Sequence, residues 1–374
     1  MKKTVINRRK ALAGFGSLAA VSTLLEQPSA AQQNISRQNT GPKLAGEAPG
    51  RIAPRADLAN VLEFEDVASR MLASAAYAPI AGGDRSFFER ITLRPRMMIS
   101  TLEMDMSVDI FGQKMFAPII VGPIAHQQQF HPEGELATAR GAAAAKAVTV
   151  VSSHSSFPIE KIAAEAKSGL WYQAFPDADA NALKTGIQQA VKAGSKAVII
   201  TVGAEYRNAK RASGPAELAK MAPAALNWKV IDQLRQGLTV PFLLKGIMTP
   251  EEADAAVKAG VQGIVVSDYG GLLVKGMATP IEVLPSIVDA VGGRVPVLVD
   301  GSFRRGSDVF KALAFGATAV MLGRPAMWGL AAYGADGVQG VVEMLQTDLG
   351  RDLGQCGTPT IKSIARAHVK IHLA

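Results

Sequence analysis

The chain has 374 residues, of which 48% are hydrophobic and 19% are charged, a composition that supplies a large core and excludes a mainly disordered chain. The single cysteine, Cys356, excludes an internal disulfide framework and a cysteine-based metal site, and the five histidines lack a zinc-protease spacing, so we expect no metal centre. Residues 1–31 carry half of the formal net charge of +8, and no long Lys/Arg run follows, so nucleic-acid binding is not expected.

Residues 1–31 have the pattern of a twin-arginine export signal. Arg8 and Arg9 precede a weakly hydrophobic, Gly- and Ala-rich run over 11–25, and small residues at 29–31 offer a cleavage site. The run is shorter than the roughly 20 apolar residues of a membrane span. We therefore expect an exported, periplasmic protein, with residues 32–56 as a flexible tether. The alternative is an amphipathic start to a cytosolic protein.

The remaining residues, 57–374, are predicted to form one barrel domain. Residues 57–110 are predicted as a helical cap over its base or mouth. Eight short apolar runs then alternate with helical patterns, which predicts a closed (β/α)8 TIM barrel, with an open doubly wound sheet as the alternative. The expected strands are 117–121, 148–152, 170–174, 197–202, 242–245, 263–267, 295–300 and 317–322. The expected helices are 133–146, 159–167, 180–193, 250–259, 280–291, 307–315 and a last helix over 361–372.

Chemistry in such a barrel takes place at the carboxyl ends of the strands, where this sequence carries polar residues. Lys245 ends the fifth run and is predicted to point into the barrel mouth. It could hold an anion, stabilise negative charge on a reduced cofactor ring, or form a Schiff base. Gln173 and Thr201 end two other runs and could ring a polar heterocycle together with Lys245.

The loops after the seventh and eighth runs predict a phosphate site. They read Asp300-Gly301-Ser302-Phe303-Arg304-Arg305-Gly306 and Gly323-Arg324-Pro325. These two loops build the phosphate site in many barrels, because glycine lets backbone N–H groups approach an anion and arginine adds a bidentate donor.

With these motifs the chain resembles the FMN-dependent α-hydroxy-acid oxidase and dehydrogenase family, which includes glycolate oxidase and the flavin lactate dehydrogenases. The resemblance covers about residues 65–368. It rests on Leu93-Arg94-Pro95-Arg96, His131-Pro132-Glu133-Gly134-Glu135, Leu243-Leu244-Lys245-Gly246, the run from Asp300 to Ala314, and Gly323-Arg324-Pro325. It implies a TIM barrel, an FMN cofactor, a small-molecule substrate, an electron acceptor that the sequence does not identify, and a homotetramer.

The resemblance also implies an intact flavin site. Pro123, Ile124 and Ala125 would run along the isoalloxazine ring, and Lys245 would lie beside the ring atoms that become negative on reduction. The ring's polar edge would contact strand-end residues, and the ribityl chain and phosphate would be held by the two loops. These two sets are Ser152, Gln173 and Thr201 for the ring edge, and Asp300, Gly301, Arg304, Gly323 and Arg324 for the ribityl chain and phosphate. Ser267, Ser302 and Phe303 are further candidate cofactor contacts.

The substrate residues depart from the family pattern. Tyr269 stands where the family has its proton-accepting His, and Leu272 where it has the carboxylate-binding Arg. Gly203 replaces the Asp that orients the His, Phe175 replaces a Tyr, and Ala78 stands at the position of the cap Tyr, next to Tyr77. The loop between Gly203 and Trp228 is also short. Tyr269, His154 and Lys245 are the candidate catalytic residues, and His126 is a further candidate base.

Three functions remain open from the sequence. The first is an FMN oxidoreductase whose substrate is not a plain 2-hydroxy acid. The second is a catalytically inactive FMN-binding protein with the same fold. The third, a flavin-free lyase that uses Lys245 as a Schiff-base nucleophile, fits poorly with the retained phosphate motifs.

Overall fold

The computed structural model describes residues 52–96, 98–176, 180–203, 228–269 and 278–372. In these residues eight parallel strands form a closed barrel in the order β10-β11-β4-β5-β6-β7-β8-β9. This confirms the TIM barrel and excludes the open sheet. The strands are β4 (Ile119–Val121), β5 (Thr149–Ser152), β6 (Leu170–Ala174), β7 (Val198–Thr201), β8 (Phe242–Ile247), β9 (Gly263–Val266), β10 (Val297–Val299) and β11 (Ala319–Leu322).

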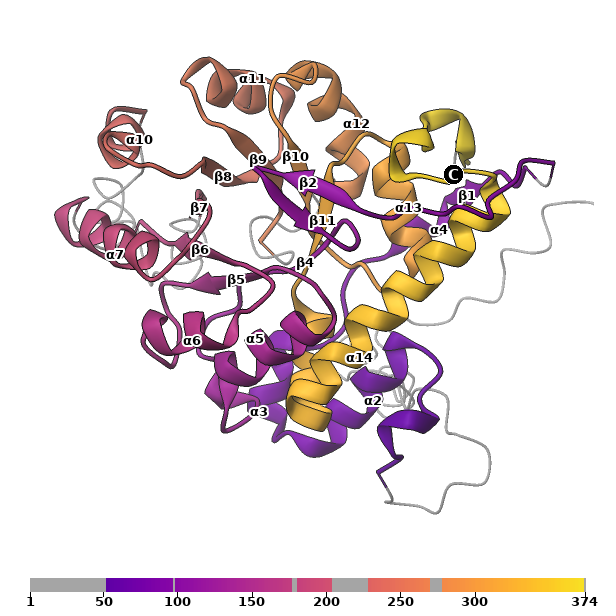
Figure 1. Ribbon diagram of the computed structural model, residues 1–374, viewed down its shortest axis with the longest axis horizontal. Coiled ribbons are helices and arrows are strands. Elements are labelled where there is room, and N and C mark those ends of the chain that lie inside the picture. The colour runs from indigo at the N-terminus through magenta and orange to yellow at the C-terminus, as the bar shows by residue number, and fades with distance from the viewer. Residues whose placement is uncertain (1–51, 97, 177–179, 204–227, 270–277, 373–374) are drawn as a thin grey trace, which may run out of the picture. The chain divides into compact units, whose positions relative to one another are not determined.

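Helices surround the barrel, as Figure 1 shows. Each strand is buried on both faces and is an almost continuous apolar run in the sequence, as expected for a strand covered by helices. The helices between the strands carry one apolar face. The helices within this ring are α5 (Gly134–Ala144), α6 (Ile159–Glu165), α7 (Ala180–Lys192), α10 (Trp228–Arg235), α11 (Pro250–Lys258), α12 (Pro280–Val291), α13 (Gly306–Ala314) and α14 (Arg324–Cys356). None of the helices in the described residues is long and apolar enough to cross a membrane.

The base of the barrel is closed by a β-hairpin rather than by helices. Strands β2 (Val108–Ile110) and β3 (Gln113–Met115) pair antiparallel. Ile110 and Met115 join the inner core at the amino ends of the barrel strands. Trp171 Nε1 donates to Gln113 Oε1 at 2.8 Å. The last residues of the predicted helical cap over 57–110 are therefore a strand, because Val108 and Ile110 belong to this hairpin.

The helical part of the cap lies against α14. It comprises α2 (Val61–Met71), α3 (Ser74–Tyr77) and α4 (Ser86–Glu89), with strand β1 (Ile91–Leu93) after them. Asn60 caps α2 by accepting a hydrogen bond from Leu62 N at 3.0 Å. Trp328, in the first turns of α14, donates to Ile80 O at 2.8 Å. These contacts bring residues 80–88 to the carboxyl ends of β10 and β11, because α14 begins directly after β11.

Two boundary predictions are wrong. Residues 361–372 form two 3-10 turns and strand β12 (Val369–Ile371), which pairs antiparallel with β1. The pairing with a distant strand overrides the local helical pattern. At the other end, Tyr333 Oη donates to Ala53 O at 2.5 Å and Arg55 Nη1 to Asp336 O at 3.1 Å. Residues 52–56 thus pack on the folded domain, whereas the rest of the predicted tether and the predicted export signal lie outside the described residues.

Candidate active site

Polar side chains at the ends of neighbouring strands contact one another inside the barrel mouth. Gln173 Nε2, on β6, donates to Thr201 Oγ1, on β7, at 2.9 Å. Lys245 Nζ, on β8, donates to Ser267 Oγ, after β9, at 2.9 Å. Ser152 on β5 lies in register with Gln173. Each of these five residues is at most 4% exposed, so the structure brings together the polar set that the sequence analysis predicted.

Asp300 follows β10 and lies beside this cluster. Its Oδ2 is 2.9 Å from Lys245 Nζ, whereas its Oδ1 is buried and has no hydrogen-bond partner among the described residues. Leaving a buried acceptor unpaired is costly, so the site fits a ligand that brings a hydroxyl donor, as the ribityl chain of FMN does. The ion pair argues against a Schiff-base role for Lys245, because an ammonium group is not a nucleophile.

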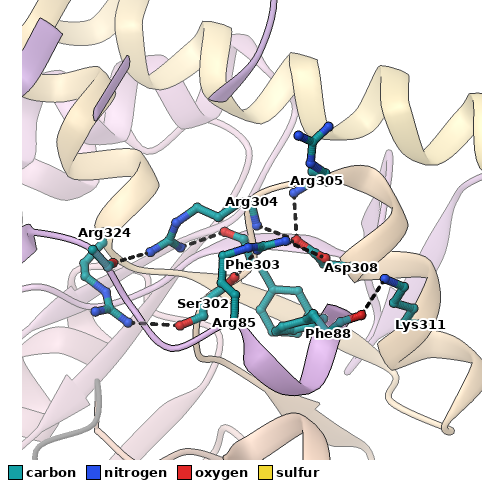
Figure 2. A network of polar contacts seen from close by, with 10 residues as sticks. Arg85, Phe88, Ser302, Phe303, Arg304, Arg305, Asp308, Lys311 and Arg324 are labelled. Carbon is teal, nitrogen blue, oxygen red and sulfur yellow. Dashed lines mark hydrogen bonds and ion pairs between the residues drawn. The ribbon is translucent and has the colours of Figure 1, made fainter. Parts of the chain in front are cut away.

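The loop after β10 forms a tight turn at the start of α13, shown in Figure 2. Gly301 and Ser302 have φ values of 103° and 60°, which turn the backbone into the left-handed region. Asp308 Oδ2 accepts the backbone N–H of Arg304 at 2.8 Å and of Arg305 at 2.9 Å. The carboxylate therefore fixes the shape of the loop that the sequence analysis assigned to phosphate.

Two arginines meet at this loop. Arg304 is 3% exposed, lies 4.3 Å from the centre of the Trp328 ring and donates through Nη2 to Gly82 O at 2.7 Å. Burial, and next the charge of Arg324, lower the pKa of Arg304 to about 9, so it remains a cation at neutral pH. Arg324 Nη2 lies 3.4 Å from Ser302 Oγ. A buried cation beside a second one fits an anionic ligand, because the anion offsets the cost of burying the charge.

The structure restricts how Phe303 and the segment from Pro123 to Ala125 can contact a cofactor. The Phe303 side chain is 1% exposed and packs edge-on against Phe88, with ring centres 5.2 Å apart. The Phe303 side chain therefore belongs to the core and not to the cofactor site, and its carbonyl accepts a hydrogen bond from Arg304 Nη1 at 2.8 Å. The half-buried segment from Pro123 to Ala125 borders the phosphate end, since Ile124 Cδ1 lies 3.5 Å from the point where a Cβ on Gly323 would be.

Four aromatic rings form a row that ends at Lys245. The His126 and His154 rings stack with centres 5.8 Å apart, and the His154 and Phe175 rings with centres 4.9 Å apart. Phe175 then meets Tyr269 edge-on at 5.6 Å, and Lys245 Nζ lies 5.3 Å from the centre of the Tyr269 ring. The candidate bases of the sequence analysis therefore share one wall, which runs from the exposed His126 to the buried Lys245.

A buried carboxylate holds the two histidine loops together. Glu135 Oε1, on α5, accepts from Gln127 N at 2.9 Å and from Ser156 N at 3.0 Å. His126 N also donates to His154 O at 2.8 Å. The Glu135 of the His131–Glu135 motif thus positions the loops after β4 and β5, a role that the sequence analysis did not assign.

The remaining substitutions are only partly within the described residues. Gly203 has a φ of 81°, and Tyr77 Oη donates to Glu65 Oε1 at 3.1 Å. Burial, and next the charge of Glu65, raise the pKa of Tyr77 to about 12, so Tyr77 stays neutral and is no base at neutral pH. Leu272 and residues 204–227 lie outside the described residues.

Sequence reasoning missed Arg85, whose guanidinium pairs with Asp308 at 2.8 Å. The only local signal is an acid at the third position of a helix that begins after two arginines, a position where carboxylates accept backbone N–H groups. The sequence around Asp308 does not reveal its partner, because Arg85 precedes it by 223 residues.

Comparison with known proteins agrees with this geometry. The model of the FMN-dependent dehydrogenase family matches residues 81–213 and 203–371. A peroxisomal (S)-2-hydroxyacid oxidase, GLO3 of Arabidopsis thaliana, is 37% identical over 84% of this chain and 96% of its own length. Glycolate oxidase of Spinacia oleracea is 34% identical over 84% of this chain and 96% of its own.

Solved structures show the same relationship. A crystal structure of mandelate oxidase with (S)-2-phenylpropionate superposes with a TM-score of 0.78 at 34% identity and covers 85% of this chain and all of its own. Relatives of this identity over nearly their full length share both fold and cofactor, which the buried strand-end cluster, the unpaired Asp300 oxygen and the arginine pair accommodate. The chain therefore belongs to the FMN-dependent α-hydroxy-acid oxidase family, whose enzymes act on CH–OH donors.

Proposed function

We propose that this enzyme oxidises a CH–OH donor that is not a plain 2-hydroxy acid such as lactate, glycolate or mandelate. The observation that supports this most directly is the wall of His126, His154, Phe175 and Tyr269, where the family pattern calls for a His base beside an Arg clamp. Arg304 and Arg324 belong to the other end of the site, and Lys245 is paired with Asp300. A carboxylate bound at the ring wall would lack a charge-assisted partner among the described residues.

The proposed division of roles follows from the contacts. FMN, when bound, supplies the acceptor for two electrons. Lys245 is held by Ser267 and Asp300 and places a fixed positive charge at the barrel mouth, where negative charge develops on reduction. Asp300 Oδ1, which is buried and unpaired among the described residues, would accept a hydrogen bond from a ribityl hydroxyl, and Gln173 and Thr201 would hold the polar edge of the ring.

Oxidation of the CH–OH donor also releases a proton, and we propose that a residue of the aromatic wall accepts it. Tyr269 and His154 lie there, with His126 behind His154. An imidazole is the most common general base in enzymes, so we favour His154 over the Tyr269 phenol as the base. We assign proton acceptance to His154, with Tyr269 shaping the pocket.

Anaerobic mixing of the yellow full-length protein with neutral secondary alcohols and with the three acids tests this proposal. Flavin absorbance should bleach with at least one neutral alcohol and persist with lactate, glycolate and mandelate. Rapid bleaching by any of the acids would overturn the substrate assignment. Persistence with every donor in a broad panel would instead favour the inactive FMN-binding alternative. Protein that neither carries FMN nor takes it up would contradict the site itself.

We also propose that the protein is exported by the twin-arginine route and assembles as a homotetramer. The basic Arg8-Arg9 pair before a Gly-rich run supports export, and that route carries folded proteins, which suits an enzyme that takes up its cofactor before transport. The tetramer is supported by family resemblance alone.

A further inference from the structure

We propose that residues 80–88, named here the strap, shape the flavin-phosphate loop and that Arg85 is the positioning residue within them. This inference rests on the proposed placement of the FMN phosphate at Arg304 and Arg324. The strap belongs to the N-terminal cap, yet its contacts reach the loop between β10 and α13 (Figure 2).

Arg85 forms hydrogen bonds with the loop and helix α13 at two places. Its Nη1 and Nη2 atoms donate to Asp308 Oδ2 at 2.8 Å and Oδ1 at 3.2 Å, a bidentate pair. Nη1 also donates to Ser302 O at 2.7 Å. The Asp308 side chain is 1% exposed and that of Arg85 22%, so solvent screens this pair less than it screens a surface ion pair.

The Arg85–Asp308 ion pair also holds the backbone N–H groups of the loop in place, because they donate to Asp308. Asp308 Oδ2 is the same oxygen that accepts from Arg304 N and Arg305 N. Ser302, whose carbonyl Arg85 binds, has a φ of 60°, a conformation that a residue other than glycine adopts only when its surroundings hold it there. Arg85 therefore stabilises both the left-handed turn and the carboxylate that orders it.

The strap backbone closes the other side of the loop. Gly82 O accepts from Arg304 Nη2 at 2.7 Å. A Cβ on Gly83 would lie 2.7 Å from Ser302 Oγ and 2.9 Å from Arg324 Nη2, and Gly83 has a φ of 143°. A larger residue at 83 would thus push against the two groups that border the phosphate position.

Aromatic packing fixes Arg85 itself. Its guanidinium lies 5.4 Å from the centre of the Phe88 ring, and Phe88 packs against Phe303 of the loop. Lys311 Nζ, on α13, donates to Phe88 O at 2.9 Å. The strap is therefore attached to both the loop and the helix that follows it.

Comparing FMN with riboflavin, which lacks the phosphate, tests the inference. Full-length apoprotein would be titrated with each flavin, with binding followed by quenching of flavin fluorescence. Arg85→Gln should raise the Kd for FMN about 10- to 100-fold, the effect of losing charge-assisted hydrogen bonds, and leave the Kd for riboflavin within about 3-fold. Arg85→Lys should fall between, because lysine cannot make the bidentate contact. Arg90→Gln is the matched control, since Arg90 also lies over a phenylalanine of the cap, at 5.2 Å from the Phe87 ring, and should change neither Kd.

Two further variants keep the outcomes distinct. Gly83→Ala should weaken FMN selectively although Arg85 is intact, and Arg324→Gln should do so through the phosphate itself. If Arg324→Gln does not weaken FMN selectively, the proposed phosphate placement fails. If it does, but Arg85→Gln weakens both flavins equally or neither, the positioning role of Arg85 is wrong. Circular dichroism of each variant identifies any that fails to fold. If Arg85→Gln does not fold, Arg85→Lys decides, and an unchanged Kd for FMN, or an equal change for both flavins, in that variant would show that the positioning role is wrong.

Discussion

Lys245 Nζ lies over the Tyr269 ring, 5.3 Å from its centre, so the residue at the family's base position presents its ring to a buried cation. This arrangement is a cation–π contact. The same ammonium group is held by Asp300 Oδ2 and Ser267 Oγ, each at 2.9 Å. Tyr269 itself is set by a hydrogen bond from its backbone N–H to Ser267 Oγ at 3.1 Å and has a φ of 56°. A positive φ is unusual for a bulky residue, so this backbone is constrained by its surroundings.

The first prediction concerns restoring 2-hydroxy-acid oxidation. Leu272→Arg alone should leave the flavin oxidised with lactate, glycolate or mandelate, because a 2-hydroxy acid held by Arg at position 272 would meet Tyr269 where the family pattern has its His base. Tyr269→His with Leu272→Arg should give slow bleaching. Loss of ~4 kcal/mol of transition-state stabilisation is nearly a thousandfold in rate, so partial recovery is measurable by stopped-flow absorbance.

Adding the family's Asp at position 203 to the double variant is not expected to raise its rate further. Gly203 has a φ of 81°, so Gly203→Asp carries backbone strain of ~1 kcal/mol or more. The double variant should therefore equal or exceed the triple variant in rate. A triple variant that is much faster would show that the orienting carboxylate outweighs the strain.

The second prediction concerns Asp300→Asn. The change removes the ion pair with Lys245 and half of the acceptor capacity of the side chain that we propose faces the ribityl chain. The buried Lys245 ammonium then keeps Ser267 but lacks its charged partner, and FMN affinity should fall about 10- to 100-fold on fluorescence titration. Asp289→Asn is the control, because Asp289 pairs with Arg366 on the surface and should leave flavin binding unchanged. Unchanged affinity in Asp300→Asn would remove Asp300 from the site.

The barrel was predictable because its strands are buried on both faces and are therefore short continuous apolar runs. The strand-end residues Gln173, Thr201 and Lys245 followed from that register. The antiparallel pair of β1 and β12 was not predictable, because the helical pattern over 361–372 is local and the pairing is not. Neither was Arg85, because its role arises only when the cap folds onto a loop 223 residues away.

The third prediction concerns export. Replacing Arg8 and Arg9 with Lys should leave folded, flavin-containing protein in the cytoplasm, because the twin-arginine signal requires the arginine pair. Fractionation with immunoblotting measures this. Replacing Lys2 and Lys3 with Gln, which leaves the pair intact, is the control. Normal export of the double-Lys variant would show that residues 1–31 direct another route or none.

The last prediction concerns a carboxyl group on α14 away from the site. Burial, and next the charge of Asp348, raise the pKa of Asp352 to about 6, against about 4 for an unfolded chain. The folded state therefore binds more protons in this window, so the contribution of Asp352 to stability is present below about pH 4 and is lost as the pH rises through about 6.

Asp352→Asn imitates the neutral form. It should raise Tm at about pH 8 and give no gain at about pH 4, measured by thermal unfolding of the full chain. Glu103→Gln, at an exposed position outside α14, should change Tm at neither pH. An equal gain for Asp352→Asn at both values would mean that packing, rather than the buried charge, limits stability at this position.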